Sequence, residues 1–350
     1  MKTGIITFHW ATNYGAVLQA YALQYFLSHE QGFDVEIINY IPRRVKFKQA
    51  ISTVRKRRFK DFVKEYKLKK FRKNNFLVSQ RKYSSSEMLI DTNQYYDVFI
   101  CGSDQIWNEW FLHKSERRIN PSYFLHFVDA GKTRISYATS FGTDELSKNT
   151  IEAITPELEK YKSIFVREKS GEAIINRMGF DVSLVVDPTL LLRKETYENI
   201  IEQEKKHRLF DFFPYILHNN QSDACKISEY IYENHFDSKK DRKYMDESIS
   251  VNEWLYSIKN TRFVLTNSYH GVIFSVLFHR PFIVVLVQNS HMNNRVITLL
   301  QLLGLEDRIV HFFEPKTVDA LLKCEIDWKM VQTTLDQLRK ESAEKLLNSL

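Results

Sequence analysis

The sequence predicts an α/β protein built from doubly wound parallel sheets, and three observations support this fold class. Short apolar strands alternate with buried helices along the chain. Several strands end in small or polar residues directly before a helix, which is typical of the carboxyl edge of such a sheet. The 350 residues exceed what one compact core usually holds, so we expect two domains.

The composition argues against several classes of protein. The three cysteines are far apart and odd in number, which fits a reducing cytoplasm better than a disulfide framework. No HExxH, CxxC or carboxylate cluster predicts a metal site. The N-terminus runs directly into a strand without a signal peptide, and no apolar run approaches the ~20 residues of a membrane span. We therefore expect a cytoplasmic protein that is soluble or peripheral.

The net charge of +7 originates in one segment. Residues 43–82 contain 17 Lys or Arg and two acids, whereas the rest of the chain contains 33 basic and 41 acidic residues. Apolar residues interrupt this segment at loosely helical spacing, which predicts a basic helical insertion. Such helices favour an anionic membrane surface, and a solvated face packed on its own domain is the alternative. No nucleic-acid-binding motif accompanies the segment, so we expect no nucleic-acid partner.

The first domain is expected to open with a strand at 3–8, a loop at 9–15 and a buried helix at 16–27. Asn13 and Tyr14 in this loop are candidate cleft residues, and a capping turn without ligand contact explains them equally well. The loop lacks the Gly-x-Gly-x-x-Gly fingerprint, so we expect no nicotinamide or flavin cofactor.

Further strands of this domain are expected at 33–40, 95–101, 134–142, 162–166 and 180–187. Two of them end in polar or aromatic candidates for the cleft or for binding an acceptor: Ser103, Asp104, Gln105, Trp107 and Ser140. Trp107 is suited either to stacking on a sugar ring or to packing in the core. Arg167, at the next strand end, can bind an oxyanion or form a salt bridge with Glu168 or another acid.

The second domain is expected to contain strands at 215–218, 263–266 and 282–287. A polar turn separates the strand at 263–266 from a buried helix that resumes at Gly271. Backbone N–H groups at such a junction suit a phosphate or a carboxylate. His270 lies at this turn, and a satisfied core histidine is the alternative. We place the domains at 1–190 and 191–312, followed by C-terminal helices and a tail at 313–350.

Seven stretches together resemble the polysaccharide pyruvyl transferase family. They occur in the expected order, and any one alone would be unspecific: residues 8–19, 102–108, 135–142, 166–171, 187–191, 266–271 and 299–308. The resemblance implies a fold like that of B-type glycosyltransferases, in which two Rossmann-like domains face each other across a cleft.

The family also implies an activity, that of a ketal-pyruvyltransferase for bacterial exopolysaccharide or capsule. Phosphoenolpyruvate is the expected donor and co-substrate, and a sugar diol becomes a cyclic pyruvate ketal as phosphate is released. That chemistry requires neither a metal nor a cofactor. Together with the basic segment, the resemblance suggests an acceptor linked to a lipid diphosphate, at the inner face of the cytoplasmic membrane.

The resemblance assigns roles to individual residues. His270 matches the catalytic histidine and Arg167 the donor-binding arginine. Many members carry Arg-Leu-His-Gly where this chain has Ser268-Tyr-His-Gly271. One guanidinium is therefore missing beside Ser268 and Gly271 in the expected donor site, and Arg295, or less favourably Lys169, is a candidate to replace it.

Two other functions remain open from the sequence. The chain has the features of a nucleotide-sugar glycosyltransferase of the same fold, or of a non-catalytic glycan-binding partner in a biosynthetic complex.

Overall fold

The computed structural model describes residues 1–43, 45, 59–116, 121–204, 210–217, 223–236, 248–288 and 290–350. Residues 44 and 46–58 of the expected basic insertion lie outside this part. The chain forms two compact units, the first made of 1–62, 69–192 and 337–350 and the second of 63–68 and 193–336. The end of the last helix, residues 337–350, thus belongs to the first unit.

The first unit contains a five-stranded parallel sheet in the order β3-β2-β1-β4-β5. A two-stranded parallel pair, β6-β7, continues it through isolated bridges that join Ile135 to Ser163 and Thr139 to Val166. The strands are β1 (Lys2–Ile6), β2 (Asp34–Tyr40), β3 (Val78–Tyr83), β4 (Val98–Cys101), β5 (Thr133–Ser136), β6 (Phe165–Val166) and β7 (Ser183–Leu184).

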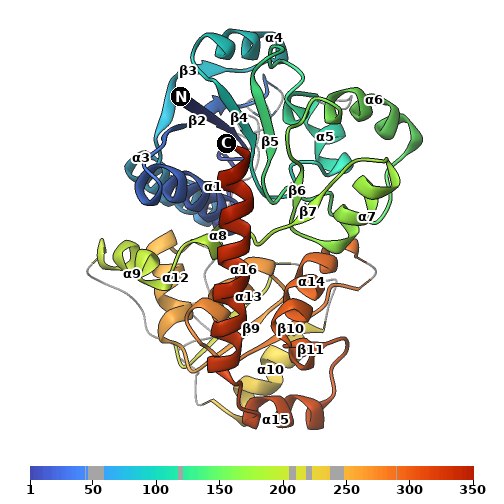
Figure 1. Cartoon of the computed structure of the whole chain (residues 1–350). Coiled ribbons are helices and arrows are strands. Elements are labelled where there is room, and N and C mark those ends of the chain that lie inside the picture. The colour runs from blue at the N-terminus through green and yellow to red at the C-terminus, as the bar shows by residue number, and fades with distance from the viewer. Residues whose placement is uncertain are drawn as a thin grey trace. The chain divides into compact units, whose positions relative to one another are not determined.

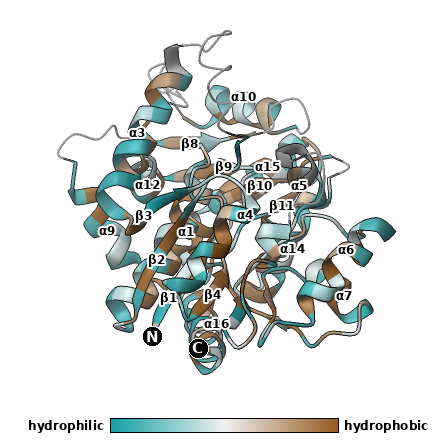
Figure 2. Cartoon of the chain, turned by 90° about the horizontal axis from the view of Figure 1, so that it is seen from above, coloured by the Kyte–Doolittle hydropathy of each residue, from teal (hydrophilic) through white to brown (hydrophobic). Residues whose placement is uncertain are grey.

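Helices connect these strands, as the alternation in the sequence predicts (Figure 1). They are α1 (Tyr14–Tyr25), α3 (Phe59–Asn75, of which 63–68 belong to the second unit), α4 (Ser86–Leu89), α5 (Glu109–Glu116), α6 (Lys148–Leu158), α7 (Lys169–Arg177) and α8 (Pro188–Leu191). Helix α1 is buried on nearly all sides, because Ala, Val and Leu occupy most of its circumference. In Figure 2, β4 is hydrophobic along its length, whereas α6 and α7 combine hydrophilic and hydrophobic residues.

Strand β3 corrects one expectation, since residues 78–83 belong to the segment for which basic composition suggested helices. Ser79 and Tyr83 of this strand are buried, and the three residues between them are exposed. The strand lies at the sheet edge, where exposed charged side chains discourage pairing with another chain. In the described part of the segment, charged side chains are therefore exposed both on a helix and on an edge strand.

The second unit contains a four-stranded parallel sheet in the order β11-β10-β9-β8. Its strands are β8 (Phe212–Tyr215), β9 (Phe263–Thr266), β10 (Phe282–Val285) and β11 (Ile309–Val310). Its helices are α9 (Lys194–Glu202), α10 (Ala224–Asn234), α12 (Val251–Asn260), α13 (Tyr269–Leu277), α14 (Asn294–Leu303) and α15 (Pro315–Lys323), and α16 (Trp328–Ser349) begins here.

Apolar side chains explain the packing of this unit. Strand residues such as Phe212, Leu265 and Ile283 form one buried cluster with Ile227 of α10 and Val318 of α15. Strand β8 begins three residues before the strand that we expected at 215–218, and residue 218 lies outside the described part. Within the described ranges, no helix combines the length and the apolar composition needed to cross a bilayer.

The loop after β1 buries a histidine whose titration contributes to the pH dependence of folding. His9 is 5% exposed, and its Nδ1 lies 3.3 Å from the carbonyl oxygen of Thr7. Burial lowers the pKa of His9 from 6.5 to about 4, since the protonated imidazole loses its hydration there. The folded state therefore binds a proton more weakly than the unfolded chain does.

We predict that this difference destabilises the protein in mild acid. Because the unfolded chain takes up the proton first, the stabilisation is complete above pH 6.5 and is lost as the pH falls toward 4. Between about pH 8 and pH 5 the loss from His9 is about 2 kcal/mol. Urea unfolding should give a shallower decline for His9→Gln than for the wild type. Parallel declines would show that His9 does not couple folding to pH.

Candidate functional site

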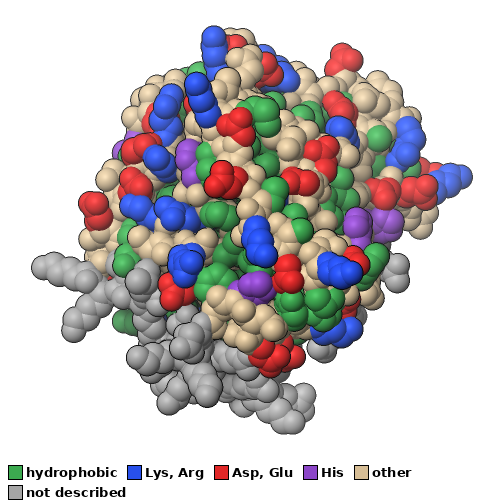
Figure 3. All heavy atoms as spheres, turned by 90° about the horizontal axis from the view of Figure 1, so that it is seen from below, with side chains coloured by type: hydrophobic (Ala, Val, Ile, Leu, Met, Phe, Trp, Pro, Cys, Tyr) green, Lys and Arg blue, Asp and Glu red, His purple; other side chains and the backbone are tan. Residues whose placement is uncertain are grey.

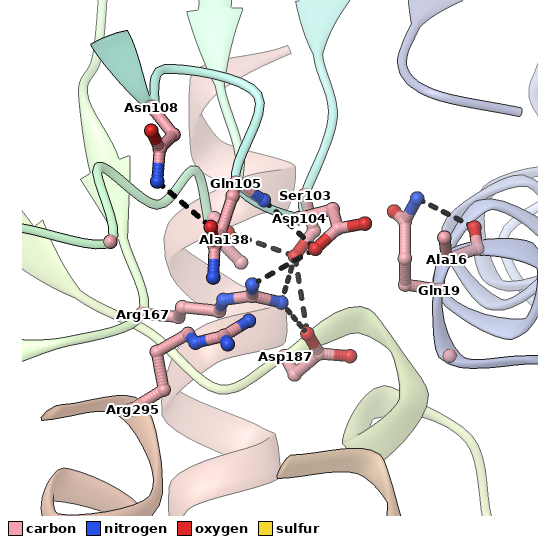
Figure 4. A network of polar contacts seen from close by, with 12 residues as sticks. Ala16, Gln19, Ser103, Asp104, Gln105, Asn108, Ala138, Arg167, Asp187 and Arg295 are labelled. Atoms are coloured by element: carbon pink, nitrogen blue, oxygen red, sulfur yellow. Dashed lines mark hydrogen bonds and ion pairs between the residues drawn. The ribbon is translucent and has the colours of Figure 1, made fainter. Parts of the chain in front are cut away.

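The carboxyl edge of the first sheet gathers polar side chains from three strand ends. Ser103 and Asp104 follow β4, Arg167 follows β6, and Asp187 lies after β7 at the start of α8. In parallel sheets these ends meet at one edge, so residues far apart in sequence come into contact. Figure 4 shows the guanidinium of Arg167 at the centre of this group.

The Arg167 guanidinium is buried and surrounded by acids. Its Nη1 donates to Asp187 Oδ2 at 2.6 Å and to Ser103 Oγ at 3.1 Å, and its Nη2 donates to Asp104 Oδ1 at 3.3 Å. Its Nε lies 3.7 Å from Glu168 Oε2. The side chains of Arg167, Glu168 and Asp187 are fully buried. One cation among three carboxylates has a formal charge of −2, which is unfavourable for an anionic donor.

Secondary contacts hold the carboxylates of this network in place. Asp187 caps α8 by accepting from the Thr189 N–H at 3.0 Å and the Thr189 hydroxyl at 2.7 Å. Glu168 Oε1 accepts the backbone N–H of Phe141 at 3.1 Å. Asp104 adopts a positive φ of 81°, a conformation rarely used by residues other than glycine. Strain of this kind often accompanies functional sites.

The structure corrects the suggestion that Trp107 stacks on a sugar. Trp107 is fully buried, its indole Nε1 donates to the Tyr123 carbonyl at 2.9 Å, and its ring stacks on Phe124. It is a core residue, as the alternative interpretation held. Ser140 is also fully buried, and its backbone connects to both Asp104 and Trp107. Gln105 accepts from Asn108 Nδ2 at 2.8 Å.

The other candidates of the first unit lie at helix starts. Asn13 caps α1 by accepting the Gly15 N–H at 2.8 Å, which is the capping turn that we considered. Tyr14 is buried in the first turn of the same helix. Lys169 is the first residue of α7 and is exposed.

In the second unit, the start of α13 is built by a tight strand-to-helix turn. Ser268 caps the helix, since its Oγ accepts the Gly271 N–H at 3.3 Å. Thr266 Oγ1 accepts the Ser268 N–H at 3.0 Å and donates to the Tyr215 carbonyl at 2.7 Å. These bonds tie the end of β8, the end of β9 and the first turn of α13 together.

His270 occupies the second position of this helix and is 6% exposed. Its ring meets that of Tyr269 nearly edge to face, with centroids 5.3 Å apart. Tyr269 also makes a cation–π contact, because the Arg295 guanidinium lies 5.4 Å from the centroid of its ring. Arg295 is in the first turn of α14, and its Nε donates to the Met292 carbonyl at 3.4 Å. The second unit therefore groups an imidazole, a guanidinium and a helix N-terminus.

Sequence reasoning missed several residues of these sites. The sequence provided no reason to select Gln19 of α1, which donates to Thr7 Oγ1 at 3.0 Å. Asp187 was predicted only as the end of a strand. Thr266 and Tyr269 lie in the stretch 266–271 that carries the family resemblance, but the sequence alone assigns no role to either. The Asp187-Pro188 pair was a detectable signal, because an acidic cap followed by proline marks a helix start. Among the described residues, no group of three or more His, Cys, Asp or Glu side chains is arranged to hold a metal ion.

Solved structures with a similar fold include UDP-N-acetylglucosamine 2-epimerase from Rickettsia bellii, with a TM-score of 0.51, 8% identity and coverage of 100% of this chain and 95% of that one. UDP-GlcNAc 2-epimerase from Neisseria meningitidis has a TM-score of 0.49 at 9% identity, covering 99% and 100%. The glycotransferase of kitacinnamycin has a TM-score of 0.45 at 10% identity, covering 100% and 98%.

The Rickettsia structure shows a shared fold alone, and it confirms the predicted α/β fold of the glycosyltransferase-B type. The cleft between the two domains stays a prediction. No curated protein matches the sequence. The family model for polysaccharide pyruvyl transferases matches residues 13–289, and this match covers well over half of the chain. The chain therefore belongs to the polysaccharide pyruvyl transferase family, whose members are pyruvyl-transferring enzymes of polysaccharide biosynthesis.

Proposed function

We propose that the protein transfers pyruvate from phosphoenolpyruvate to two hydroxyls of one sugar in a polysaccharide precursor, forming a cyclic ketal and releasing phosphate. The observation that carries this proposal is the position of His270, which is held by the capped first turn of α13 at the end of β9. An acid-base group next to a helix N-terminus suits a reaction in which a proton moves and phosphate departs.

We assign the donor to the second unit. The start of α13, His270 and Arg295 carry positive charge or N–H donors, and Ser268 and Gly271 form the turn beneath them. Arg167, the arginine that the resemblance assigns to the donor, already has three carboxylate neighbours in the first unit. We therefore propose that Arg295 supplies the guanidinium for the donor and that Arg167 organises the strand ends. Lys169, which is exposed, is the weaker candidate.

The proposed reaction has three steps that balance. Protonated His270 gives its proton to the methylene carbon of the donor, and the positive charge that develops at C2 is shared with oxygen. The first sugar hydroxyl adds to C2 and returns its proton to His270. The second hydroxyl then displaces phosphate by attacking C2, and its proton leaves with the phosphate. Arg295 and the start of α13 stabilise the charge on the departing group.

We propose that the acceptor is linked to a lipid diphosphate and that the protein works in the cytoplasm, peripherally on the inner face of the membrane. Polar side chains of the first unit are the acceptor candidates: Asn13, Tyr14, Ser103, Asp104, Gln105 and Ser140. Carboxylates and amides are suitable partners for sugar hydroxyls. The reaction needs no metal or further cofactor, since phosphoenolpyruvate supplies both the carbon unit and the leaving group.

The direct test supplies phosphoenolpyruvate with candidate lipid-linked glycans and follows phosphate release together with product mass. The proposal predicts phosphate release only with the correct acceptor, and a glycan heavier by one pyruvate less one water. Phosphate release without that mass gain would indicate hydrolysis of the donor. Acceptance of a nucleotide sugar in place of phosphoenolpyruvate would support a glycosyltransferase instead.

We predict that His270→Asn lowers kcat by 10²–10⁴-fold without loss of folding, since general acid-base catalysis has about that value. His279→Asn is the matched control, because His279 lies just beyond the other end of α13, where it contacts Gln332 at 2.9 Å. Its φ of 52° is one that Asn tolerates. Steady-state rates of phosphate release measure both variants. Equal activity of His270→Asn and wild type would remove His270 from catalysis.

We predict that Tyr269→Leu raises KM for phosphoenolpyruvate about 2–30-fold, because a cation over an aromatic ring gains roughly 0.5–2 kcal/mol. Tyr269→Phe keeps the ring under Arg295 and should behave like the wild type. In a double-mutant cycle, Arg295→Ala should remove most of the effect of Tyr269→Leu. Additive effects of the two changes would show that Tyr269 does not act through Arg295.

We predict that Arg167→Met lowers the free energy of unfolding by about 3–5 kcal/mol, because removing one partner of a buried ion pair leaves unpaired charge. Adding Asp187→Asn should recover part of this loss, since Asp187 is the shortest contact of Arg167. Urea unfolding measures each variant. A fully stable Arg167→Met with only a raised KM for phosphoenolpyruvate would instead assign Arg167 to donor binding, as the resemblance implies.

A further inference from the structure

Helix α3 exposes a stripe of aromatic and basic side chains. Phe62 and Tyr66 are 55% and 64% exposed. At 3.6 residues per turn they share one side of the helix with Lys69 and Lys73, in an i, i+4, i+7, i+11 pattern. Lys70 borders this stripe and is exposed as well. We call these five residues the α3 stripe.

The opposite side of α3 is the one that packs on the protein. Leu68 and Phe71 are buried, and Phe71 meets the ring of Tyr21 of α1 at 5.9 Å between centroids. Arg72 Nη1 donates to the Ala11 carbonyl at 3.0 Å. These contacts fix the rotation of α3 about its own axis, so the side chains of the α3 stripe point into solvent and not into the core.

The charges of the stripe are unbalanced. Between Asp61 and Asn75 the helix has six basic residues and two acids. No ion pair within the described ranges involves Lys69, Lys70 or Lys73, whereas Lys67 lies 3.7 Å from Glu253 Oε2. Leu77, directly after the helix, is a further apolar residue with 53% exposure. By comparison, the face in Figure 3 shows basic and acidic side chains interspersed with each other.

We propose that the α3 stripe docks on an anionic phospholipid membrane. Its lysines match acidic headgroups, and its aromatic side chains suit the boundary between headgroups and acyl chains. The stripe runs about 16 Å along the helix, which is consistent with a helix lying in the plane of the interface. This inference deepens the proposed function, because a lipid-linked acceptor resides in such a membrane, but it rests on the geometry of α3 and not on the catalytic residues.

The test is sedimentation of the full chain with vesicles of phosphatidylglycerol and phosphatidylcholine, against vesicles of phosphatidylcholine alone. We expect binding to the anionic vesicles only, lost in about 1 M salt, where the Debye length falls to ~3 Å. Replacing Lys69, Lys70 and Lys73 by Gln should weaken binding about 100-fold, since each lysine near such a surface contributes roughly fivefold. The same change at Lys316, Lys323 and Lys329 is the charge-matched control.

Insertion of the aromatic residues has its own readout. Tyr66→Trp should gain fluorescence that bromine-labelled lipid quenches, measured as the difference from the wild type. Equal binding of the two triple variants, absence of binding at low salt, or displacement of the protein from vesicles by single-stranded RNA would each overturn the inference. Phosphate release with a lipid-linked acceptor dispersed in detergent is measured in parallel, because its failure would count against the proposed reaction and not against membrane docking.

Discussion

The position of His270 depends on the close contact between Gly271 and Thr266. A Cβ atom on residue 271 would lie 2.4 Å from Thr266 Oγ1, so only glycine lets α13 start this close to β9. The same Thr266 hydroxyl joins the first turn of α13 to β8 through Ser268 and Tyr215. Thr266 and Gly271 thus determine how closely α13 approaches β9, and with it the position of the His270 imidazole.

The two units organise charge in opposite ways. In the first, a single buried guanidinium holds together three carboxylates that come from different strand ends. Burying such a network costs desolvation free energy. In exchange, the network holds the loops in one defined arrangement, which includes the positive φ of Asp104. In the second, a helix N-terminus, an imidazole and a guanidinium over an aromatic ring lie close together, on the consecutive helices α13 and α14. The proposed reaction requires one site for the acceptor hydroxyls and one for the anionic donor, and we assign these roles to the acidic edge and to the turn before α13.

The fold was predictable because its signals are local. The apolar stretches at 263–266 and 282–287 became β9 and β10, and glycine and serine marked the turn that opens α13. The segment 78–83 was harder, because only two of its side chains face the core and basic residues obscure the alternation. β3 lies at the sheet edge because it pairs with β2, a strand some forty residues earlier, for example between Ile37 and Val78. A sequence pattern within 78–83 does not contain this information.

The sequence predicted where the candidate sites lie better than it predicted what their residues do. Strand ends and helix starts identified Ser103, Asp104, Arg167 and His270 from the sequence. Whether a side chain binds a ligand or a neighbour depends on residues far away in the chain. Arg167 meets Asp104 63 residues earlier and Asp187 20 residues later, and Trp107 is enclosed by aromatic rings from two other segments. Arg295 in α14 likewise contacts the ring of Tyr269 in α13, and the hydrophobic periodicity of neither helix predicts this contact.

The claim that α13 receives the donor can be tested by following histidine ring signals in nitrogen-15 NMR spectra while phosphoenolpyruvate is added. The His270→Asn variant assigns the His270 signals among the 11 histidines. Our account predicts that the His270 signals shift and saturate as the donor binds, while those of His279 stay in place. Saturable binding of phosphoenolpyruvate that leaves His270 unchanged would contradict it.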